Sequence, residues 1–159
     1  MKRQPKKQPE TSDRLVVASN RKARYDYEIV ESHEAGIVLV GSEVKSIFFG
    51  KAGLHDSYVK LEKGELWAIN IYIDPYEASS YFKIESRRPR KLLMHRKEID
   101  RLRSKTQEKG YTIVPLLLYF HHGKAKLEIG LARGKRQYDR REQIADREMR
   151  REKERGDKL

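Results

Sequence analysis

The sequence of 159 residues contains no cysteine and no long apolar run. Without cysteine there can be no disulfide framework, no thiolate metal site and no thiol nucleophile, and an oxidising compartment gains no support. No apolar run approaches the roughly 18 residues that a membrane helix needs, and residues 2–13 are too polar for the apolar region of a signal peptide. We therefore expect a cytoplasmic protein that has no membrane partner.

Apolar side chains are scarce in general, at 37% of the chain, so we expect one domain with a modest core and polar ends. They are scarcest after Tyr138, where Ile144 and Met149 are the only large ones before the terminal Leu159. That is too few to offset the roughly 1–2 kcal/mol per residue that backbone ordering costs. We predict a disordered basic arm over residues 1–19, a folded domain over residues 20–132, and a basic tail over residues 133–159 that is disordered until it binds and then becomes helical.

Charge, by contrast, is abundant and unevenly placed. The chain has 36 Lys and Arg against 24 Asp and Glu, a net charge of +12. The positive excess lies in residues 1–25, 87–105 and 133–159, whereas residues 26–86 are net negative. Three basic clusters around an acidic core are more typical of a nucleic-acid footprint than of a merely soluble surface. The charge pattern therefore favours an RNA or DNA partner.

Hydrophobic periodicity predicts many short strands and few helices. Strands are expected over residues 25–30, 37–40, 57–61, 66–69 with an extension to 73, 111–120 and 126–131, and helices over 42–48, with Ser42 as cap, and within 92–110. Turns are expected at residues 62–65 and 121–123, and a bulge or an edge position at Pro115. This pattern predicts a β-rich α+β fold, an OB-like small closed β-barrel of about six antiparallel strands with two or three flanking helices.

Four features resemble catalytic or metal sites but are better explained by structure. Residues 36–41 have the glycine spacing of a phosphate-binding loop, yet Ser-Glu follows where Lys-Ser/Thr is needed. Triad residue types stand side by side at residues 55–57, whereas real triads assemble from separate segments. The His121-His122 pair fits a hairpin turn, and Asp26 with Glu28 fits solvent-facing alternation. We predict no catalytic residue, no metal and no cofactor.

The segment Asn20 to Tyr25 carries the clearest binding signal. It combines guanidinium groups that match phosphates, an amide that can read a base edge and a ring on which a base can stack. A basic arm that Tyr25 anchors to the core explains the same residues equally well. Composition alone leaves both interpretations open.

Seven segments in one order resemble a known family. They are NRKARYDY (residues 20–27), EAGIVL (34–39), GSEVKSI (41–47), DSY (56–58), RKLLMH (90–95), KGYTIVPL (109–116) and GLARGK (130–135). Together they are similar to small protein B, the bacterial SsrA-binding protein family, the partner of transfer-messenger RNA. The resemblance covers the chain from about Asn20 into the tail.

The resemblance implies a non-enzymatic adaptor for ribosome rescue by trans-translation. Its members have an OB-like barrel that grips the elbow of the tRNA-like domain of transfer-messenger RNA, in place of an anticodon arm. It implies a monomer that acts alongside alanyl-tRNA synthetase and elongation factor Tu. The residues implied in RNA binding are Asn20, Arg21, Lys22, Arg24, Tyr25, Glu34, Lys91, Leu93, His95 and Lys126. Because a carboxylate repels phosphate, Glu34 is expected to accept hydrogen bonds from a base or to hold an arginine in position.

The tail of this family enters the decoding centre and the empty mRNA channel of a stalled ribosome. The residues implied in that contact are Gly134, Lys135, Arg136, Tyr138, Asp139, Arg140 and Arg141. Tyr138 would stack on a base of ribosomal RNA, and the basic residues would neutralise phosphates.

One position departs from the family pattern, since Phe48 stands where arginine is usual. Any RNA contact at Phe48 is then lost or replaced by stacking. Two other functions remain open, a general OB-type RNA chaperone or ribosome-associated factor and an RNA-processing nuclease, which would need a set of metal-binding carboxylates.

Overall fold

The computed structural model describes residues 14–75, 84–135 and 137–156. Within these residues the chain forms nine strands and four helices. In chain order they are β1 (Arg14–Ser19), α1 (Arg21–Asp26), β2 (Tyr27–Ile37), α2 (Gly41–Phe48), β3 (Ala52–Gly53), β4 (Tyr58–Glu62), β5 (Glu65–Ile69), β6 (Tyr72–Ile73), β7 (Arg90–Leu93), α3 (Arg96–Thr106), β8 (Tyr111–His121), β9 (Lys124–Gly134) and α4 (Gln137–Gly156).

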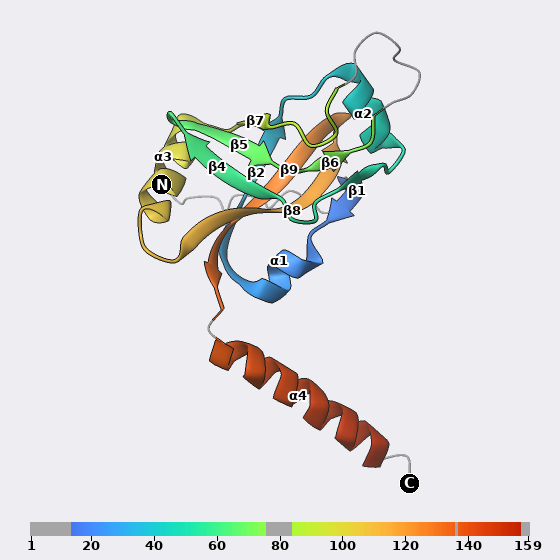
Figure 1. Cartoon of the computed structure of the whole chain (residues 1–159), viewed down its shortest axis with the longest axis vertical. Coiled ribbons are helices and arrows are strands. Elements are labelled where there is room, and N and C mark those ends of the chain that lie inside the picture. Colours follow the sequence, from blue (N-terminus) through green and yellow to red (C-terminus); the bar gives the residue numbers. More distant parts are fainter. Residues whose placement is uncertain (1–13, 76–83, 136, 157–159) are drawn as a thin grey trace, which may run out of the picture.

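Six of the strands close into a ring. The hydrogen-bonded order is β8, β4, β5, β7, β2 and β9, and β9 pairs again with β8 to complete the circle. Every pairing is antiparallel, and β1 lies beside β8 outside the ring. Figure 1 shows the closed barrel with α1, α2 and α3 around it. The predicted OB-like barrel of about six strands is confirmed.

The inner faces of the ring form the main core. Alternate residues of β9, Leu127, Ile129 and Leu131, are buried there, as their alternation predicts. A smaller apolar cluster lies outside the ring, where Ala23 of α1 packs on Val114, Leu116 and Ala132. The helix α1 is therefore fixed to the barrel by apolar contacts of its own.

The bulge predicted at Pro115 makes this outer cluster possible. The register of β8 against β9 shifts between Pro115 and Leu117, so Leu116 is the extra residue. Gly130 of β9 lies beneath it, and a Cβ at Gly130 would stand 2.9 Å from Cδ1 of Leu116. Because glycine has no side chain, Leu116 can close over the strand and pack on α1.

Two tight turns fix the long hairpins. In each, two successive residues have positive φ, Lys63 (50°) with Gly64 (76°) and His122 (49°) with Gly123 (75°). Paired left-handed residues are the mark of the type I′ hairpin turn, whose twist suits the flanking strands. Both predicted turns are confirmed, and His122 is a residue of the second turn.

A buried ion pair fixes α2 to β7. The guanidinium of Arg90 is fully buried and donates from Nε to Oε2 of Glu43 at 2.6 Å and from Nη1 to the carbonyl of Ile71 at 2.7 Å. Arg88 also donates to Glu43, whose Oε1 accepts from the backbone N–H of Val40 at 3.1 Å. Val40, and not the predicted Ser42, is thus the N-cap of α2.

Several predicted elements are wrong in position. The strand predicted from residue 25 begins only at Tyr27, because residues 21–26 form α1, which Asn20 caps and which Ala23 packs against the outside of the ring. Residues 38–40 are not a strand, since β2 ends at Ile37 and the backbone turns into α2. Leu92 belongs to β7, not to the face of α3, and residues 72–73 form β6, which pairs with β3.

The predicted domain limits also shift at both ends. Residues 14–19, assigned to the disordered arm, form β1, because they pair with the exposed edge of β8. The barrel does not end at Ala132, since β9 continues to Gly134, which pairs with Tyr27. Beyond it, α4 extends away from the barrel (Figure 1). None of the helices in the described part of the chain combines the length and the apolar character needed to span a membrane.

Candidate nucleic-acid interface

Four of the predicted binding residues come together on the outside of the barrel. Glu34 of β2, Lys91 and Leu93 of β7 and Lys126 of β9 are outward neighbours of buried residues on their strands. Leu93 lies opposite Gly36, and Gly36 lies opposite Lys126, so segments 57 and 90 residues apart in sequence become adjacent. We call these four residues the barrel face.

Gly36 is the centre of the barrel face. A Cβ there would stand 3.3 Å from Cβ of Leu93, so glycine lets Leu93 lie over the strand. The side chain of Leu93 stays 54% exposed, an apolar contact surface between charged neighbours. His95 follows two residues later as the exposed N-cap of α3.

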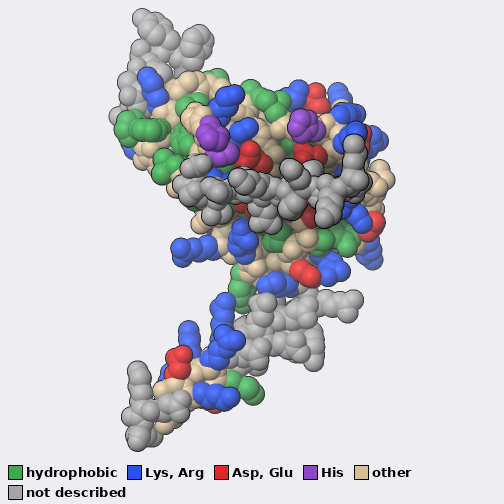
Figure 2. Space-filling view, turned by 180° about the vertical axis from the view of Figure 1, so that it is seen from behind, with side chains coloured by type: hydrophobic (Ala, Val, Ile, Leu, Met, Phe, Trp, Pro, Cys, Tyr) green, Lys and Arg blue, Asp and Glu red, His purple; other side chains and the backbone are tan. Residues whose placement is uncertain are grey.

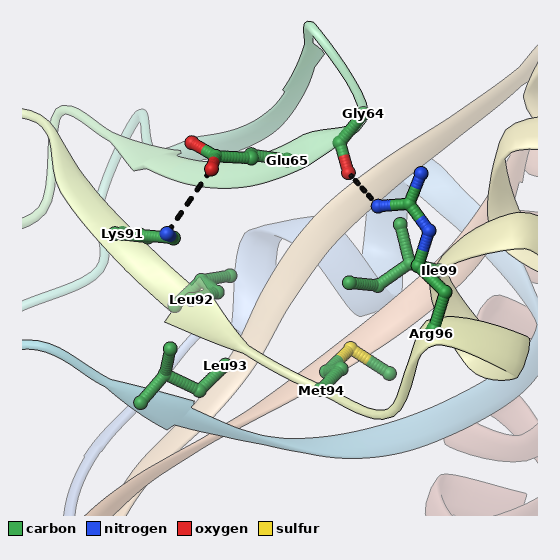
Figure 3. Close-up of a pocket in the computed structure, with 8 residues that line it drawn as sticks. All are labelled: Gly64, Glu65, Lys91, Leu92, Leu93, Met94, Arg96 and Ile99. Carbon is green, nitrogen blue, oxygen red and sulfur yellow. Dashed lines mark hydrogen bonds and ion pairs between the residues drawn. The ribbon is translucent and has the colours of Figure 1, made fainter.

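A shallow hollow lies beside the barrel face. It has a volume of about 250 Å³ and is lined by residues of β7, α3 and the β4–β5 turn, among them Lys91 and Leu93 (Figure 3). Nζ of Lys91 is 3.1 Å from Oε1 of Glu65, and Arg96 donates to the carbonyl of Gly64 at 3.0 Å. Lys91 and Arg96, the basic residues that line this hollow, are thus bound by residues at the β4–β5 turn.

Glu34 is held by two residues that sequence reasoning missed. The hydroxyl of Tyr119 donates to Oε2 of Glu34 at 2.5 Å, and Nη2 of Arg14 is 3.6 Å from the same oxygen. The guanidinium of Arg14 lies over the ring of Tyr119, 4.6 Å from its centroid. Arg14 is thus an arginine beside Glu34, as one of the two roles expected for Glu34 requires. Tyr119 pairs with Lys126 in register, a pairing that the strand prediction alone could have suggested.

Asn20 is committed to the fold. Its Nδ2 donates to the carbonyl of Pro115 at 2.9 Å, its Oδ1 accepts from the N–H of Ala23 at 3.1 Å, and its own N–H donates to the carbonyl of Leu116 at 2.9 Å. The side chain is buried, so its amide caps α1 and ties it to the bulge of β8.

The exposed side of α1 carries the remaining cations of this segment. Arg21, Lys22 and Arg24 are exposed, and Tyr25 is 37% exposed. Ala23 and Asn20, rather than Tyr25, anchor the segment, so the ring of Tyr25 stays accessible. Figure 2 shows Lys and Arg side chains over one face of the barrel and along the described part of α4.

Strand register relates α1 to the barrel face. Glu34 lies opposite Glu128, Glu128 opposite Leu117, and Leu117 opposite Ser19, the residue before Asn20. Three strand spacings amount to about 14 Å. The residue before α1 therefore lies three strand positions from Glu34, a separation that a single folded RNA can span.

The tail begins at the C-terminal end of α1. The N–H of Lys135 donates to the carbonyl of Asp26 at 3.2 Å, and Gly134 is exposed. Arg136 lies outside the described residues. Tyr138, Asp139, Arg140 and Arg141 fall within α4, and their side chains also lie outside the described set.

The features that resembled catalytic sites have structural explanations. The hydroxyl of Ser57 donates to the carbonyl of Leu54 at 2.6 Å, so it faces away from His55, which pairs with Asp56 on the surface. The rings of His121 and His122 lie 4.1 Å apart in the turn. Among the residues that the structure describes, no three His, Asp or Glu side chains are grouped to hold a metal ion.

Phe48 does not pack inward. It is 65% exposed at the end of α2 and makes edge contacts with the rings of Phe49 (5.6 Å) and Phe120 (6.3 Å). The position that departs from the family pattern is thus a surface ring and not a core residue.

Comparison with known proteins agrees with the ordered motifs. The family model described as SmpB protein matches residues 17–158. SsrA-binding proteins of Carboxydothermus hydrogenoformans and Thermobifida fusca are 55% and 51% identical to this chain, covering 89% and 95% of it and 95% and 94% of their own lengths. A solved structure entitled "tmRNA-SmpB: a journey to the center of the bacterial ribosome" is similar at a TM-score of 0.64 and 49% identity, over 79% of this chain and 92% of that chain. The chain belongs to the SmpB protein family.

Proposed function

We propose that this chain is a transfer-messenger RNA-binding adaptor for trans-translation on the bacterial ribosome. One observation carries the proposal, namely that SsrA-binding proteins match this chain at 51–55% identity over nearly their full lengths. The similar structure, whose title joins tmRNA and SmpB in the ribosome, supports the same partners. Proteins of this family bind RNA as adaptors and are not enzymes.

The barrel binds the elbow of the tRNA-like domain. The barrel face and α1 supply the three kinds of group that such a contact needs, phosphate-binding cations, an apolar surface and a stacking ring. Lys126, Lys91, Arg21, Lys22 and Arg24 neutralise phosphates, and Leu93, His95 and Tyr25 contact bases or riboses. Asn20 contributes by fixing α1, since both ends of its amide are already bonded within the fold.

The tail acts on the ribosome. Gly134 and Lys135 lead from the barrel into α4, and the segment to Arg141 contacts the decoding centre, with Tyr138 stacked on ribosomal RNA. The rest of α4 lies in the empty mRNA channel. Its described side chains are exposed, which suits a helix that has no partner within its own chain and gains one on binding.

Cell location and assembly follow from this function. An adaptor for bacterial ribosomes works in the cytoplasm, as a monomer on one RNA. Alanyl-tRNA synthetase and elongation factor Tu act on the same RNA beside it.

Competition binding tests the proposal. At physiological salt, the protein should bind the tRNA-like domain of transfer-messenger RNA more tightly than an elongator tRNA. Both RNAs present an elbow, but the elongator tRNA has the anticodon arm whose place the protein takes. Equal affinity for both would refute the adaptor function and favour a general RNA chaperone of the OB type.

Truncation separates the two halves of the function. A chain ending at Lys135 retains all of β9, including the residues Arg133 and Gly134 that pair with β2. It should bind transfer-messenger RNA with near-normal affinity and fail to support peptide tagging on stalled ribosomes. Normal tagging by the truncated chain would contradict the role of the tail.

A further inference from the structure

The outer surface of β1, β2, β8 and β9 contains an ion-pair network of which the RNA-binding residues implied by the resemblance include only Glu34. Glu34 and Glu128 lie directly opposite each other on β2 and β9. Two like charges in that position repel. Arg14 of β1 relieves the repulsion, because its guanidinium is 3.6 Å from Glu34 and 3.9 Å from Glu128.

Tyr119 makes a shorter contact with Glu34 than Arg14 does. Its hydroxyl is 2.5 Å from Oε2, whereas the contacts of Arg14 are longer than hydrogen bonds. The side chain of Tyr119 is fully buried beneath Arg14, so its position is fixed by packing. Burial, together with the hydrogen bond to Glu34, raises the pKa of Tyr119 far above its ordinary value. The hydroxyl therefore remains a donor throughout the physiological range.

The two contacts use one oxygen of the carboxylate. The hydroxyl of Tyr119 and the closest approach of Arg14 are both to Oε2, and in the described part of the chain no hydrogen bond is made to Oε1. The side chain of Glu34 is 34% exposed. Its orientation is thus set from the protein side, with Oε1 as the oxygen that remains for a donor from outside.

We propose that Arg14 and Tyr119 are positioning residues that present Oε1 of Glu34 to a hydrogen-bond donor of the bound RNA. The donor is a base amino or imino group or a ribose 2′-hydroxyl, because a carboxylate accepts from these and repels phosphate. Lys126, one strand away and directly opposite Tyr119, lies where it can neutralise a phosphate beside that nucleotide. The inference rests on the proposed function and adds two residues and one atom to it.

A double-mutant cycle tests the positioning role. The probe is the tRNA-like domain of transfer-messenger RNA, and the variants of the full chain are Tyr119→Phe, Glu34→Gln and their combination. Tyr119→Phe keeps the ring under Arg14 and removes only the hydroxyl, so it should weaken binding about threefold to tenfold, within the range for the loss of one ordinary hydrogen bond. The combined variant should bind no more weakly than Glu34→Gln alone, since Tyr119 acts through Glu34.

A matched control separates positioning from general damage. The hydroxyl of Tyr72 also bonds a carboxylate, Oδ1 of Asp74 at 3.1 Å, but on β6 and outside the barrel face. Tyr72→Phe should bind the probe like the unmodified chain. The binding-competent fraction of each variant is titrated with excess RNA, so partial misfolding does not enter the dissociation constants. Fully additive losses from Tyr119→Phe and Glu34→Gln, or no loss from Tyr119→Phe, would overturn the proposal.

Arg14→Met provides a second variant, which tests the positioning role if Tyr119→Phe does not fold. It leaves Glu34 and Glu128 opposed without a cation between them, so binding should weaken about tenfold and should recover in the combination of Arg14→Met with Glu128→Gln. Recovery is not expected if Arg14 itself binds phosphate. Unchanged binding, or a loss that Glu128→Gln does not reverse, would exclude the positioning role of Arg14.

Two substitution scans of the probe identify the donor. In one scan each base is replaced in turn by an analogue that lacks one amino or imino donor, such as inosine for guanosine, and in the other each ribose is replaced in turn by 2′-deoxyribose. The unmodified chain should lose affinity at one position in one of the scans, and Glu34→Gln should be insensitive at that position. If no position depends on Glu34 although the probe outcompetes tRNA, the inference fails while the proposed function stands. If the probe does not outcompete tRNA, the proposed function itself fails.

Discussion

Glu34 and Glu43 are both glutamates bound by arginine, yet they occupy opposite situations in the molecule. Glu43 is almost fully buried and accepts hydrogen bonds from Arg88, Arg90 and the N–H of Val40, which engage both of its oxygens. Glu34 lies on the barrel face, and among the described residues its polar contacts, at Oε2, are with Tyr119 and Arg14. A carboxylate whose two oxygens are both bonded inside the protein serves the fold, whereas one held at a single oxygen can serve a partner.

The cost of losing each carboxylate differs for the same reason. A buried ion pair is only modestly favourable as a whole, but the loss of one member strands the other in an apolar surrounding. A partly exposed pair leaves its partner in contact with water. The comparison therefore separates effects on stability from effects on binding.

The largest expected effect is on Glu43. Glu43→Gln keeps the volume of the side chain but leaves the fully buried guanidinium of Arg90 without a counter-charge. The free energy of unfolding should fall by about 3–5 kcal/mol, measured by urea unfolding. The matched variant Glu34→Gln should change it by less than about 1 kcal/mol. Similar losses for both would show that Glu34 is also a residue of the fold.

Low pH should also reveal the contribution of Glu43 to the free energy of unfolding. Burial raises the pKa of Glu43, but the hydrogen bonds from Arg88, Val40 and Arg90 outweigh it and hold this pKa below the ordinary value of 4.5. Because the folded pKa lies below the unfolded one, the stabilisation is complete above about pH 4.5 and is lost as the pH falls towards the folded pKa.

Thermal unfolding between pH 7 and pH 3 measures this loss. The melting temperature should fall below about pH 4.5, and the fall should be shallower in Glu43→Gln, which has no carboxylate to protonate. Glu31, whose pKa is lowered mainly by its hydrogen bond with Arg101, contributes a remaining slope in both proteins. An identical acid slope with and without Glu43 would exclude its role in the pH dependence.

The barrel could be foreseen because local signals agree with the fold. The alternation of Leu127, Ile129 and Leu131, the glycine turns and Pro115 predict the long hairpin and its bulge, which the structure confirms. Residues 14–19 were assigned to the arm because they follow a polar segment. Their apolar run acquires a strand structure only through pairing with the edge of β8, a contact about 100 residues away in sequence.

The site could be foreseen only in part. The motifs named Glu34, Leu93 and Lys126, but not that Gly36 lies between them, because that depends on two long-range registers. Asn20 is predicted to be a base-reading amide, and its hydrogen bond to the carbonyl of Pro115 could not be foreseen because it depends on the bulge of β8. Arg14 and Tyr119 belong to no motif, and the pairings of β1 with β8 and of β9 with β8 and β2 bring them to Glu34.

Asn20 offers an intermediate test of the comparison, since it belongs to the fold but supports a surface that binds. Asn20→Ala removes the cap of α1 and leaves the carbonyl of Pro115 without its donor, so the free energy of unfolding should fall by about 1–2 kcal/mol. Asn20→Ser restores an oxygen for the N–H of Ala23 and should recover part of the loss. If RNA affinity falls without any loss of stability, Asn20 contacts RNA directly.

The smallest expected effect on stability is at Lys126. It is an outward residue of β9, and Lys126→Ala should change the free energy of unfolding by less than about 0.5 kcal/mol. Its effect should appear in the salt dependence of RNA binding, because each phosphate contact releases about one counterion and the slope of log K against log salt should become shallower by about one. Glu34→Gln and Tyr119→Phe should weaken binding without lowering this slope, since neither removes a cation. A lower slope in Tyr119→Phe would mean that Tyr119 holds a phosphate-binding group in place. Glu34, as a carboxylate that orients a base, and Lys126, as a cation that neutralises the backbone, would then not be distinguished by the salt dependence.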